Sequence, residues 1–319
     1  MSLMFEEESG IEDIVERIAS DDAAVRRIAV MELADVSFDP EAELLGIKAL
    51  ADADSDVRLE AARVLYEFEG DEVAQALVDA LQDTDEKVRL AAADTLAENK
   101  DSSVAPVLIK ALQGASDPFV MAALLRALRE HRVADTQQLA LSALSHADAS
   151  VRREAVGVLA YLKAEEVVLA LMDAARNDPD PEVRRVAVGS LVFSKTDRSC
   201  EVLKNALQDS NWQVREEAAF VIGKLGREEC ADALIAAMDD SYWEVCVKSA
   251  RSLGQLKSTR AVEILGSTLG HGMSNLRKEA AAALGEIGDK AARPYLLKAQ
   301  DDVDPDVRKL VQWALQRVG

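Results

Sequence analysis

The sequence has few aromatic residues and few cysteines. Phe, Trp and Tyr make up 4% of the 319 residues, whereas apolar residues as a whole make up 49%. This balance argues against disorder and favours helices that pack through alanine, valine and leucine over a core built around large rings. The three cysteines show no Cys-x-x-Cys spacing and exclude a disulfide framework, so we expect a reducing, cytoplasmic location.

Signals for secretion, membrane insertion and catalysis are also missing. The first ten residues carry Glu6, Glu7 and Glu8 where a signal peptide would be basic and then apolar, and no uncharged run of about 18 residues occurs. No glycine-rich phosphate loop, Gly-x-Ser-x-Gly elbow or paired metal-ligand motif is present. The sequence therefore predicts a soluble chain without catalytic residues, metal or cofactor, and without a membrane partner.

Basic residues are scarce at one end of the chain. Of the formal net charge of −21, residues 1–100 supply 27 Asp and Glu against 9 Lys and Arg, whereas the other 219 residues hold 31 and 28. Such an acidic segment repels phosphate backbones and argues against nucleic-acid binding. A solvated surface and a site for a basic partner are both compatible with it.

What the sequence does contain is one repeated phrase: an acidic turn, then Val-Arg, two small residues and a leucine. Its first apolar residue, which we call the anchor, recurs every 31 or 32 residues. The ten anchors are Val25, Val57, Val88, Val120, Val151, Val183, Val214, Val245, Leu276 and Val307.

Each anchor begins the apolar face of a helix. The residue eight positions later is leucine in nine repeats and isoleucine in one, and the residue at anchor+4 is mostly alanine. These three positions share one helical face at about 100° per residue, so they predict core contacts. Predicted N-caps stand three residues before the anchor, where a side-chain oxygen can accept from a free helix amide: Asp22, Asp54, Asp85, Asp117, Asp148, Asp180, Asn211 and Asp304.

A shorter helical stretch precedes each cap, so every repeat is a helix pair. One pair of this size cannot bury its own apolar face, and neighbouring pairs must stack on it. We therefore predict a single α-solenoid domain over residues 1–319. Its predicted parts are an N-terminal capping unit at 1–35, stacked repeats at 36–288 and a C-terminal capping unit at 289–319.

The repeats resemble the HEAT family, and more narrowly the short HEAT-like repeats named from phycobilisome lyases. Asp178-Pro-Asp-Pro-Glu-Val-Arg184 and Ser210-Asn-Trp-Gln-Val-Arg-Glu-Glu-Ala-Ala219 carry the resemblance, which covers the whole chain. The resemblance implies a right-handed superhelix of about ten 31-residue repeats, with the second helix of each pair on the concave side. It also implies a ladder between an aspartate in each turn and the arginine after the anchor.

Carried onto this sequence, the ladder has gaps. Ala115 and Met121 occupy an acid slot and an arginine slot, from which we predict a bend near 115–121; His146, His271 and Cys246 are further departures. The matching acids are Asp52, Asp83, Asp178, Asp209, Asp240 and Asp302. The matching arginines are Arg26, Arg58, Arg89, Arg152, Arg184, Arg215, Arg277 and Arg308.

Two enzyme classes share this repeat. HEAT-like deoxyhypusine hydroxylases hold a di-iron site with His-Glu pairs, and none of His131, His146 and His271 is followed by Glu, which excludes that activity. Bilin lyases remain as the alternative, with a linear tetrapyrrole as ligand. The repeat alone does not establish bilin lyase activity, because one fold hosts many functions.

A candidate binding surface follows from the helix geometry. Positions anchor+3, +6 and +10 lie opposite the core face and are expected to be exposed. At +10, acids in the first four repeats give way to aromatics in the fifth and sixth, and glycines occur at +6 in the same two repeats. With aromatic residues from the next two repeats and two arginines at +2, the candidate residues are Arg153, Gly157, Tyr161, Arg185, Gly189, Phe193, Trp212, Phe220 and Trp243.

Aromatic and arginine side chains dominate the energetics of protein interfaces. The sequence therefore predicts a non-catalytic scaffold or adaptor that holds another protein on its concave helical surface. An alternative interpretation is that the tryptophans pack in the turns between repeats and that Tyr161 and Phe193 cover core leucines.

Overall fold

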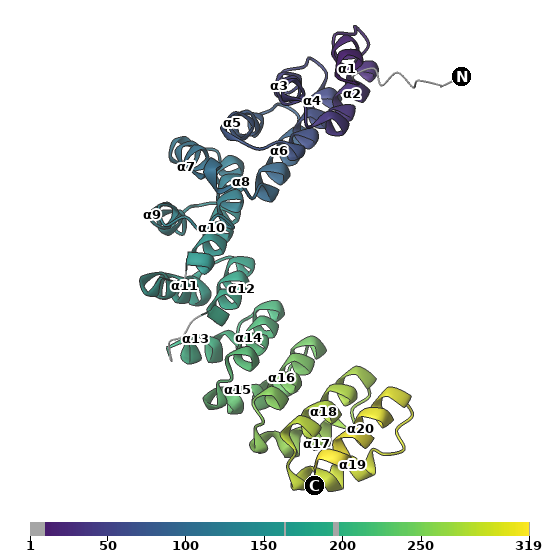
Figure 1. The fold of residues 1–319 in the computed structure, drawn as a ribbon. Coiled ribbons are helices and arrows are strands. Elements are labelled where there is room, and N and C mark those ends of the chain that lie inside the picture. The colour runs from purple at the N-terminus through teal and green to yellow at the C-terminus, as the bar shows by residue number, and fades with distance from the viewer. Residues whose placement is uncertain (1–9, 163, 194–197, 319) are drawn as a thin grey trace, which may run out of the picture. The chain divides into compact units, whose positions relative to one another are not determined.

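The computed structural model describes residues 10–162, 164–193 and 198–318. Regular structure in these residues is entirely helical (Figure 1). This confirms the predicted all-α solenoid class. The first nine residues of the predicted N-terminal cap lie outside the described residues.

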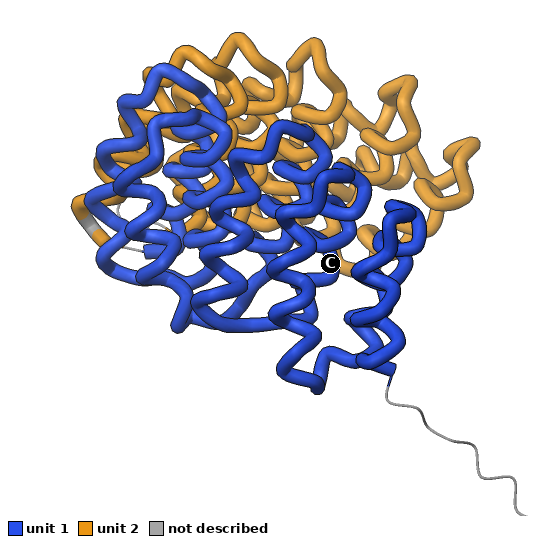
Figure 2. Tube along the Cα trace, turned by 90° about the horizontal axis from the view of Figure 1, so that it is seen from above, with its two compact units in different colours: residues 1–162 blue, residues 163–319 orange. Residues whose placement is uncertain are grey.

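The chain divides into two compact units, residues 1–162 and 163–319, which Figure 2 colours separately. Each unit holds five helix pairs, so all ten predicted repeats are helix pairs. The single domain, the two capping units and the bend near 115–121 stay predictions.

In unit 1 first and second helices alternate along the chain, and the second helices carry the anchors. The first helices are α1 (Gly10–Ile18), α3 (Pro40–Ala49), α5 (Asp71–Ala80), α7 (Ala105–Gly114) and α9 (Thr136–Ala143). The second helices are α2 (Ala23–Glu32), α4 (Ser55–Val64), α6 (Glu86–Glu98), α8 (Pro118–Leu128) and α10 (Ala149–Leu162). Each second helix packs against the next second helix of the unit.

Unit 2 repeats this arrangement. Its first helices are α11 (Glu165–Asn177), α13 (Ser199–Ala206), α15 (Ala231–Ala236), α17 (Val262–Thr268) and α19 (Arg293–Lys298). Its second helices are α12 (Pro181–Ser190), α14 (Trp212–Leu225), α16 (Trp243–Gln255), α18 (Ser274–Ile287) and α20 (Pro305–Arg317).

Short 3-10 helices extend or precede several of these elements. They are η1 (Leu33–Val36), η2 (Leu65–Glu67), η3 (Ser102–Val104), η4 (Leu191–Phe193), η5 (Glu228–Cys230), η6 (Ala237–Asp239), η7 (Thr259–Ala261) and η8 (Lys290–Ala292).

The predicted helix starts are confirmed. Each of the eight predicted N-cap side chains accepts a hydrogen bond from a backbone N–H in the first turn of its second helix, at 2.8 to 3.1 Å. Each bond satisfies an amide that the helix leaves without a partner and contributes about 1 kcal/mol.

The predicted core is also confirmed. Nine of the ten anchors are buried, as are nine of the ten residues at anchor+8. The two exceptions, Val25 and Leu315, are half-buried and belong to the first and last helix pairs, which have a described neighbour on one side only. Stacking therefore supplies the burial that a single pair lacks.

Second helices pack closely at three of the five repeats of unit 2, where anchor+9 is Gly223, Gly254 or Gly285; the other two repeats hold Val192 and Gln316 there. A Cβ added to Gly254 would lie 2.8 Å from the Cα of Ala283 on α18, and one added to Gly285 would lie 3.0 Å from the Cα of Ala314 on α20. No side chain fits these distances, so glycine sets the spacing. The same position in unit 1 holds Ala34, Tyr66, Ala97, Arg129 and Ala160.

Candidate functional site

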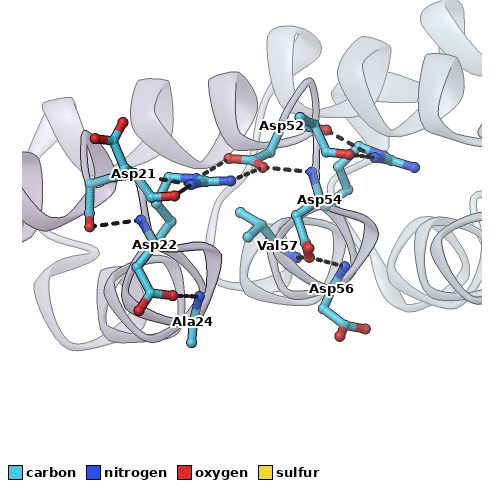
Figure 3. Close-up of polar contacts among 11 residues, drawn as sticks. Asp21, Asp22, Ala24, Asp52, Asp54, Asp56 and Val57 are labelled. Atoms are coloured by element: carbon cyan, nitrogen blue, oxygen red, sulfur yellow. Dashed lines mark hydrogen bonds and ion pairs between the residues drawn. The ribbon is translucent and has the colours of Figure 1, made fainter.

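An arginine–aspartate ladder connects successive repeats. In the first ladder pair, Arg26 donates through Nε and Nη2 to both carboxylate oxygens of Asp52, each at 2.7 Å. Figure 3 shows this pair, in which Asp52 also accepts from the N–H of Asp54 at 2.8 Å. All five predicted pairs that fall within one unit have this geometry: Arg26–Asp52, Arg58–Asp83, Arg184–Asp209, Arg215–Asp240 and Arg277–Asp302.

The ladder changes the ionisation of its members. The hydrogen bond from Arg58 lowers the pKa of Asp83, and the same hydrogen bond raises the pKa of Arg58. Each ladder arginine also donates through Nη1 to a carbonyl six residues earlier in its own turn, as from Arg58 to Asp52 O at 2.9 Å. An arginine of this ladder therefore fixes its own turn and links it to the next repeat.

The departures from the ladder keep part of its hydrogen bonding. His146 Nδ1 accepts from the N–H of Asp148 at 3.0 Å, as a ladder aspartate would. The thiol of Cys246 donates to Asp240 O at 3.3 Å, where an arginine would use Nη1. In both places the turn keeps a hydrogen bond of the ladder, while the ladder pair to the neighbouring repeat is replaced.

The candidate binding residues of unit 1 lie together on α10. Arg153 pairs with Glu154 at 3.0 Å, and the guanidinium of Arg132 lies over the ring of Tyr161 at 5.1 Å from the ring centroid. Gly157 is buried, because the Cδ of Arg129 would lie 3.1 Å from an added Cβ. The prediction that anchor+6 is exposed is therefore wrong at Gly157.

In unit 2 the candidate residues form two groups, one of which lies on α12 and its 3-10 extension. Arg185 pairs with Glu182 at 2.5 Å, and Phe193 is 53% exposed. Gly189 is half-buried, and an added Cβ would lie 2.9 Å from Oε1 of Glu217 on α14. Both glycines therefore admit a neighbour's long side chain, and neither opens a gap in the surface.

The second group lies on α14 and α16. Phe220 lies between two lysines, since the ammonium groups of Lys224 and Lys248 are each 5.4 Å from its ring centroid. Trp212 stacks on Tyr242 with ring centroids 5.4 Å apart, so it packs in the turn between repeats as the alternative interpretation expects. Trp243 is 39% exposed.

Sequence reasoning missed a second exposed surface, on α4 to α10 of unit 1. Leu90 of α6 is 48% exposed and lines three hollows with volumes of about 450, 520 and 590 Å³. Tyr66 lines the first of these and Phe119 the other two. The signal in the sequence is leucine at anchor+2, where Arg153 and Arg185 stand in later repeats.

The cysteines form part of the core. Cys200, Cys230 and Cys246 are unpaired and buried. The Sγ of Cys230 lies 4.0 Å from Cys200 O, so these two cysteines are neighbours in the core. Burial and a hydrogen bond with Glu229 raise the pKa of Cys200 to about 12, which keeps its thiol protonated and poorly nucleophilic.

Stacked helix pairs joined by a ladder define an α-solenoid repeat protein. A family model described as HEAT repeats matches residues 11–97, 75–144, 136–223, 201–272 and 231–316. The chain belongs to the HEAT-repeat family. A search of curated protein sequences finds no match.

Solved structures share this fold at low sequence identity. An engineered protein is 22% identical with a TM-score of 0.53, and covers 97% of this chain and 98% of its own. The Escherichia coli protein YibA is 20% identical with a TM-score of 0.62 over 83% of this chain and 98% of its own. A structure of Kap95p with RanGDP is 14% identical with a TM-score of 0.65 over 96% of this chain and 50% of the other.

No helix among the described residues has the length and apolarity needed to cross a membrane.

Proposed function

We propose that this protein is a non-catalytic scaffold that holds a partner protein against the face formed by its second helices. The observation that carries the proposal is the exposure of apolar side chains on that face. In unit 1, Leu90 is 48% exposed and lines three hollows; in unit 2, Phe193 is 53% exposed and Phe220 is half-buried. Apolar side chains gathered on one face are typical of interaction sites.

The comparisons support this proposal through the fold. Proteins with similar solenoids occur in complexes with other proteins: Kap95p with RanGDP, Kap121p with Nup53p, and Kap95 with Nup1. The last two similarities cover 41% and 50% of the longer chains. A stacked helical surface of this kind binds proteins without catalytic residues.

We further propose that the face formed by the second helices is the concave one, as the resemblance to HEAT repeats implies. Within unit 2 we place the partner over Arg185, Phe193, Phe220 and Trp243, and within unit 1 over Arg153 and Tyr161. The reducing, cytoplasmic location remains part of the proposal, and the unpaired state of the three cysteines supports it.

The test is cross-linking and capture from an extract of the source cells with the full chain as bait. Phe193→Ser/Phe220→Ser changes the face in unit 2, Leu90→Ser changes it in unit 1, and Val303→Ser changes an equally apolar residue that is 89% exposed in the turn before α20. We expect one defined protein to be captured in stoichiometric amount, and at least one face variant to reduce capture tenfold while Val303→Ser does not. Equal capture by all variants would contradict the proposed face.

The short repeat type of phycobilisome lyases leaves a tetrapyrrole ligand as the alternative. The 31- or 32-residue spacing supports the repeat type, which is shared with scaffolds that bind no chromophore. Mixing the protein with phycocyanobilin tests the alternative, since a bound bilin shifts its visible absorbance. An unchanged spectrum would exclude it.

A further inference from the structure

The ladder lacks one carboxylate at the junction of α6 and α8, because Ala115 stands in the acid slot. The backbone at Ala115 has φ −75° and ψ 139°. At the ladder residues Asp178 and Asp240 these angles are −61° and 133°, and −67° and 144°. The turn therefore has the conformation of a ladder turn and lacks only the side chain.

The donors for that missing carboxylate are nevertheless in place. Arg89 uses Nη1 to bond Asp83 O at 2.8 Å and Thr84 O at 3.3 Å, as other ladder arginines bond their own turns. Its Nε and Nη2, which elsewhere bind an aspartate, meet no carboxylate of the described chain. The N–H of Asp117, two residues after the slot, likewise has no acceptor among the described residues. The corresponding three donors bind the carboxylate of Asp240 at another junction, and Arg89 and Asp117 line the same hollow.

Arg89 differs in this respect from the other departures. His146 and His271 also occupy acid slots, and there the preceding arginine slots hold Met121 and Cys246. At those junctions both partners are replaced together. At the α6–α8 junction the arginine remains without its acid.

The surroundings of Arg89 are apolar on one side and have few free charges. A hollow of about 520 Å³ is lined by Leu90, Phe119 and Val120, and the guanidinium of Arg89 lies over the Phe119 ring at 5.9 Å. Of the nearby acids, Asp83 is bound to Arg58 at 2.7 Å and Asp117 caps α8. Glu86 is the remaining carboxylate on the rim.

We propose that this hollow binds a carboxylate of a partner protein, which completes the ladder from outside the chain. The carboxylate accepts from Nε and Nη2 of Arg89 and from the N–H of Asp117. An apolar side chain next to it in the partner packs on Leu90 and Phe119. This inference rests on the proposed function, since a partner protein supplies the acid.

The decisive variant is Ala115→Asp, which supplies the carboxylate from within. It should raise the urea midpoint of the full chain, because it forms a further ladder pair with Arg89, and at the same time block the ligand. Ser116→Asp adds the same charge at the neighbouring exposed position and is the matched control. Loss of binding together with increased stability cannot result from misfolding.

The probe is a displayed library of random dodecapeptides, selected on the wild-type full chain and then made as labelled peptides. We expect selected peptides to place Asp or Glu next to an apolar residue. Their affinity should fall about tenfold or more on Ala115→Asp or when the peptide acid becomes its amide, which is the size of a charge-assisted bidentate bond. Ser116→Asp should change affinity less than twofold, and Glu86→Gln should increase it.

A carboxylate can come from a side chain or from the end of a chain. Peptides with free and with amidated C-termini distinguish these sources: loss on amidation assigns the terminal carboxylate, and loss on replacement of an internal acid assigns the side chain. Either result supports the proposal.

Two results would overturn it. One is that selection yields no peptide whose binding depends on an acid; the other is that selected peptides bind Ala115→Asp as well as wild type. If the chain captures a partner from cell extract and Ala115→Asp leaves that capture unchanged, the carboxylate site fails while the scaffold function stands.

Discussion

The two units use one repeat to build surfaces of different character. Unit 1 holds 33 acidic and 15 basic residues in positions 1–162, whereas unit 2 holds 25 and 22. Alanine and larger residues stand at anchor+9 in unit 1, and the exposed Leu90 lines hollows there. In unit 2, glycine at Gly223, Gly254 and Gly285 brings the second helices together.

Charged side chains on the second helices follow the same division. In unit 2, pairs link each second helix to the next: Arg185–Glu217, Lys248–Glu216, Arg251–Glu279 and Lys278–Asp306. In unit 1 such pairs are Arg126–Asp94 and Arg129–Glu154. The comparison teaches that residues outside the core decide how closely repeats pack and how much of their surface is left for a partner.

The chain carries a natural probe for this comparison. Its three tryptophans, Trp212, Trp243 and Trp313, all lie in unit 2. Tryptophan fluorescence therefore follows unit 2, and circular dichroism at 222 nm follows both units.

Acid should have the largest effect. The ladder arginines lower the pKa of the three ladder aspartates of unit 2 and the two of unit 1, with burial opposing the shift. A carboxyl with a lowered folded pKa stabilises fully above the unfolded pKa of about 4 and loses this as pH falls through the folded value. At pH values below about 4 we expect the urea concentration at the unfolding midpoint to decrease. The decrease should be larger when unfolding is followed by fluorescence than by circular dichroism.

Two glutamates act with the opposite sign, of which Glu217 is half-buried and Glu286 is exposed. Partial desolvation by neighbouring groups raises the pKa of both carboxyl groups, so their protonation stabilises unit 2 as pH falls. They cannot account for a loss of stability in acid. A fluorescence midpoint that stays constant down to pH 3 would show that the ladder contributes little.

Removing one ladder arginine should have the next largest effect. Arg184 and Asp209 are each 11% exposed, and breaking a pair this buried costs about 3 kcal/mol. Arg89→Met removes the turn hydrogen bonds without breaking a ladder pair and should cost about 1 kcal/mol. Urea unfolding of Arg184→Met and Arg89→Met measures both, and equal losses would mean that the link between repeats contributes nothing.

Replacing a glycine by alanine should change the free energy of unfolding by a smaller amount, and with opposite signs in the two units. Gly254→Ala forces a Cβ to 2.8 Å from the Cα of Ala283, and such overpacking costs about 1 to 3 kcal/mol. Gly114→Ala in unit 1 meets nothing within 4 Å and should stabilise by about 0.5 to 1 kcal/mol. Thermal unfolding of the two variants, followed by both probes, measures these changes in stability. If the midpoint of Gly254→Ala equals that of the wild type, α16 and α18 can move apart freely.

Salt should have the smallest effect. Raising ionic strength from 0.01 to 0.1 M shortens the Debye length from about 30 to about 10 Å, which weakens repulsion within the acidic unit 1. We expect a rise of a few tenths of a kcal/mol in stability by circular dichroism and none by fluorescence. An equal response of both probes would indicate that the charge difference between the units has no energetic consequence.

Local features of the fold could be predicted, and features that depend on spacing between helices could not. A cap such as Asp54 and an anchor such as Val57 act within one helix, so their positions in the sequence suffice. The helical period predicts an exposed Gly157, but Arg129 of the preceding repeat covers it, and one helix's period does not contain that contact. The hollows at Leu90 depend on how far apart α4, α6 and α8 lie, which a helical period does not contain.

Each ladder arginine makes two separable sets of bonds, one within its own turn and one to the next repeat. Arg89 and Arg308 keep the first set, and the described chain shows no ladder aspartate on either. A repeat can therefore keep its shape when a single substitution cuts its link to a neighbour. In an array built this way, substitutions can change the strength of one junction between repeats at a time, while the hydrogen bonds within every turn are preserved.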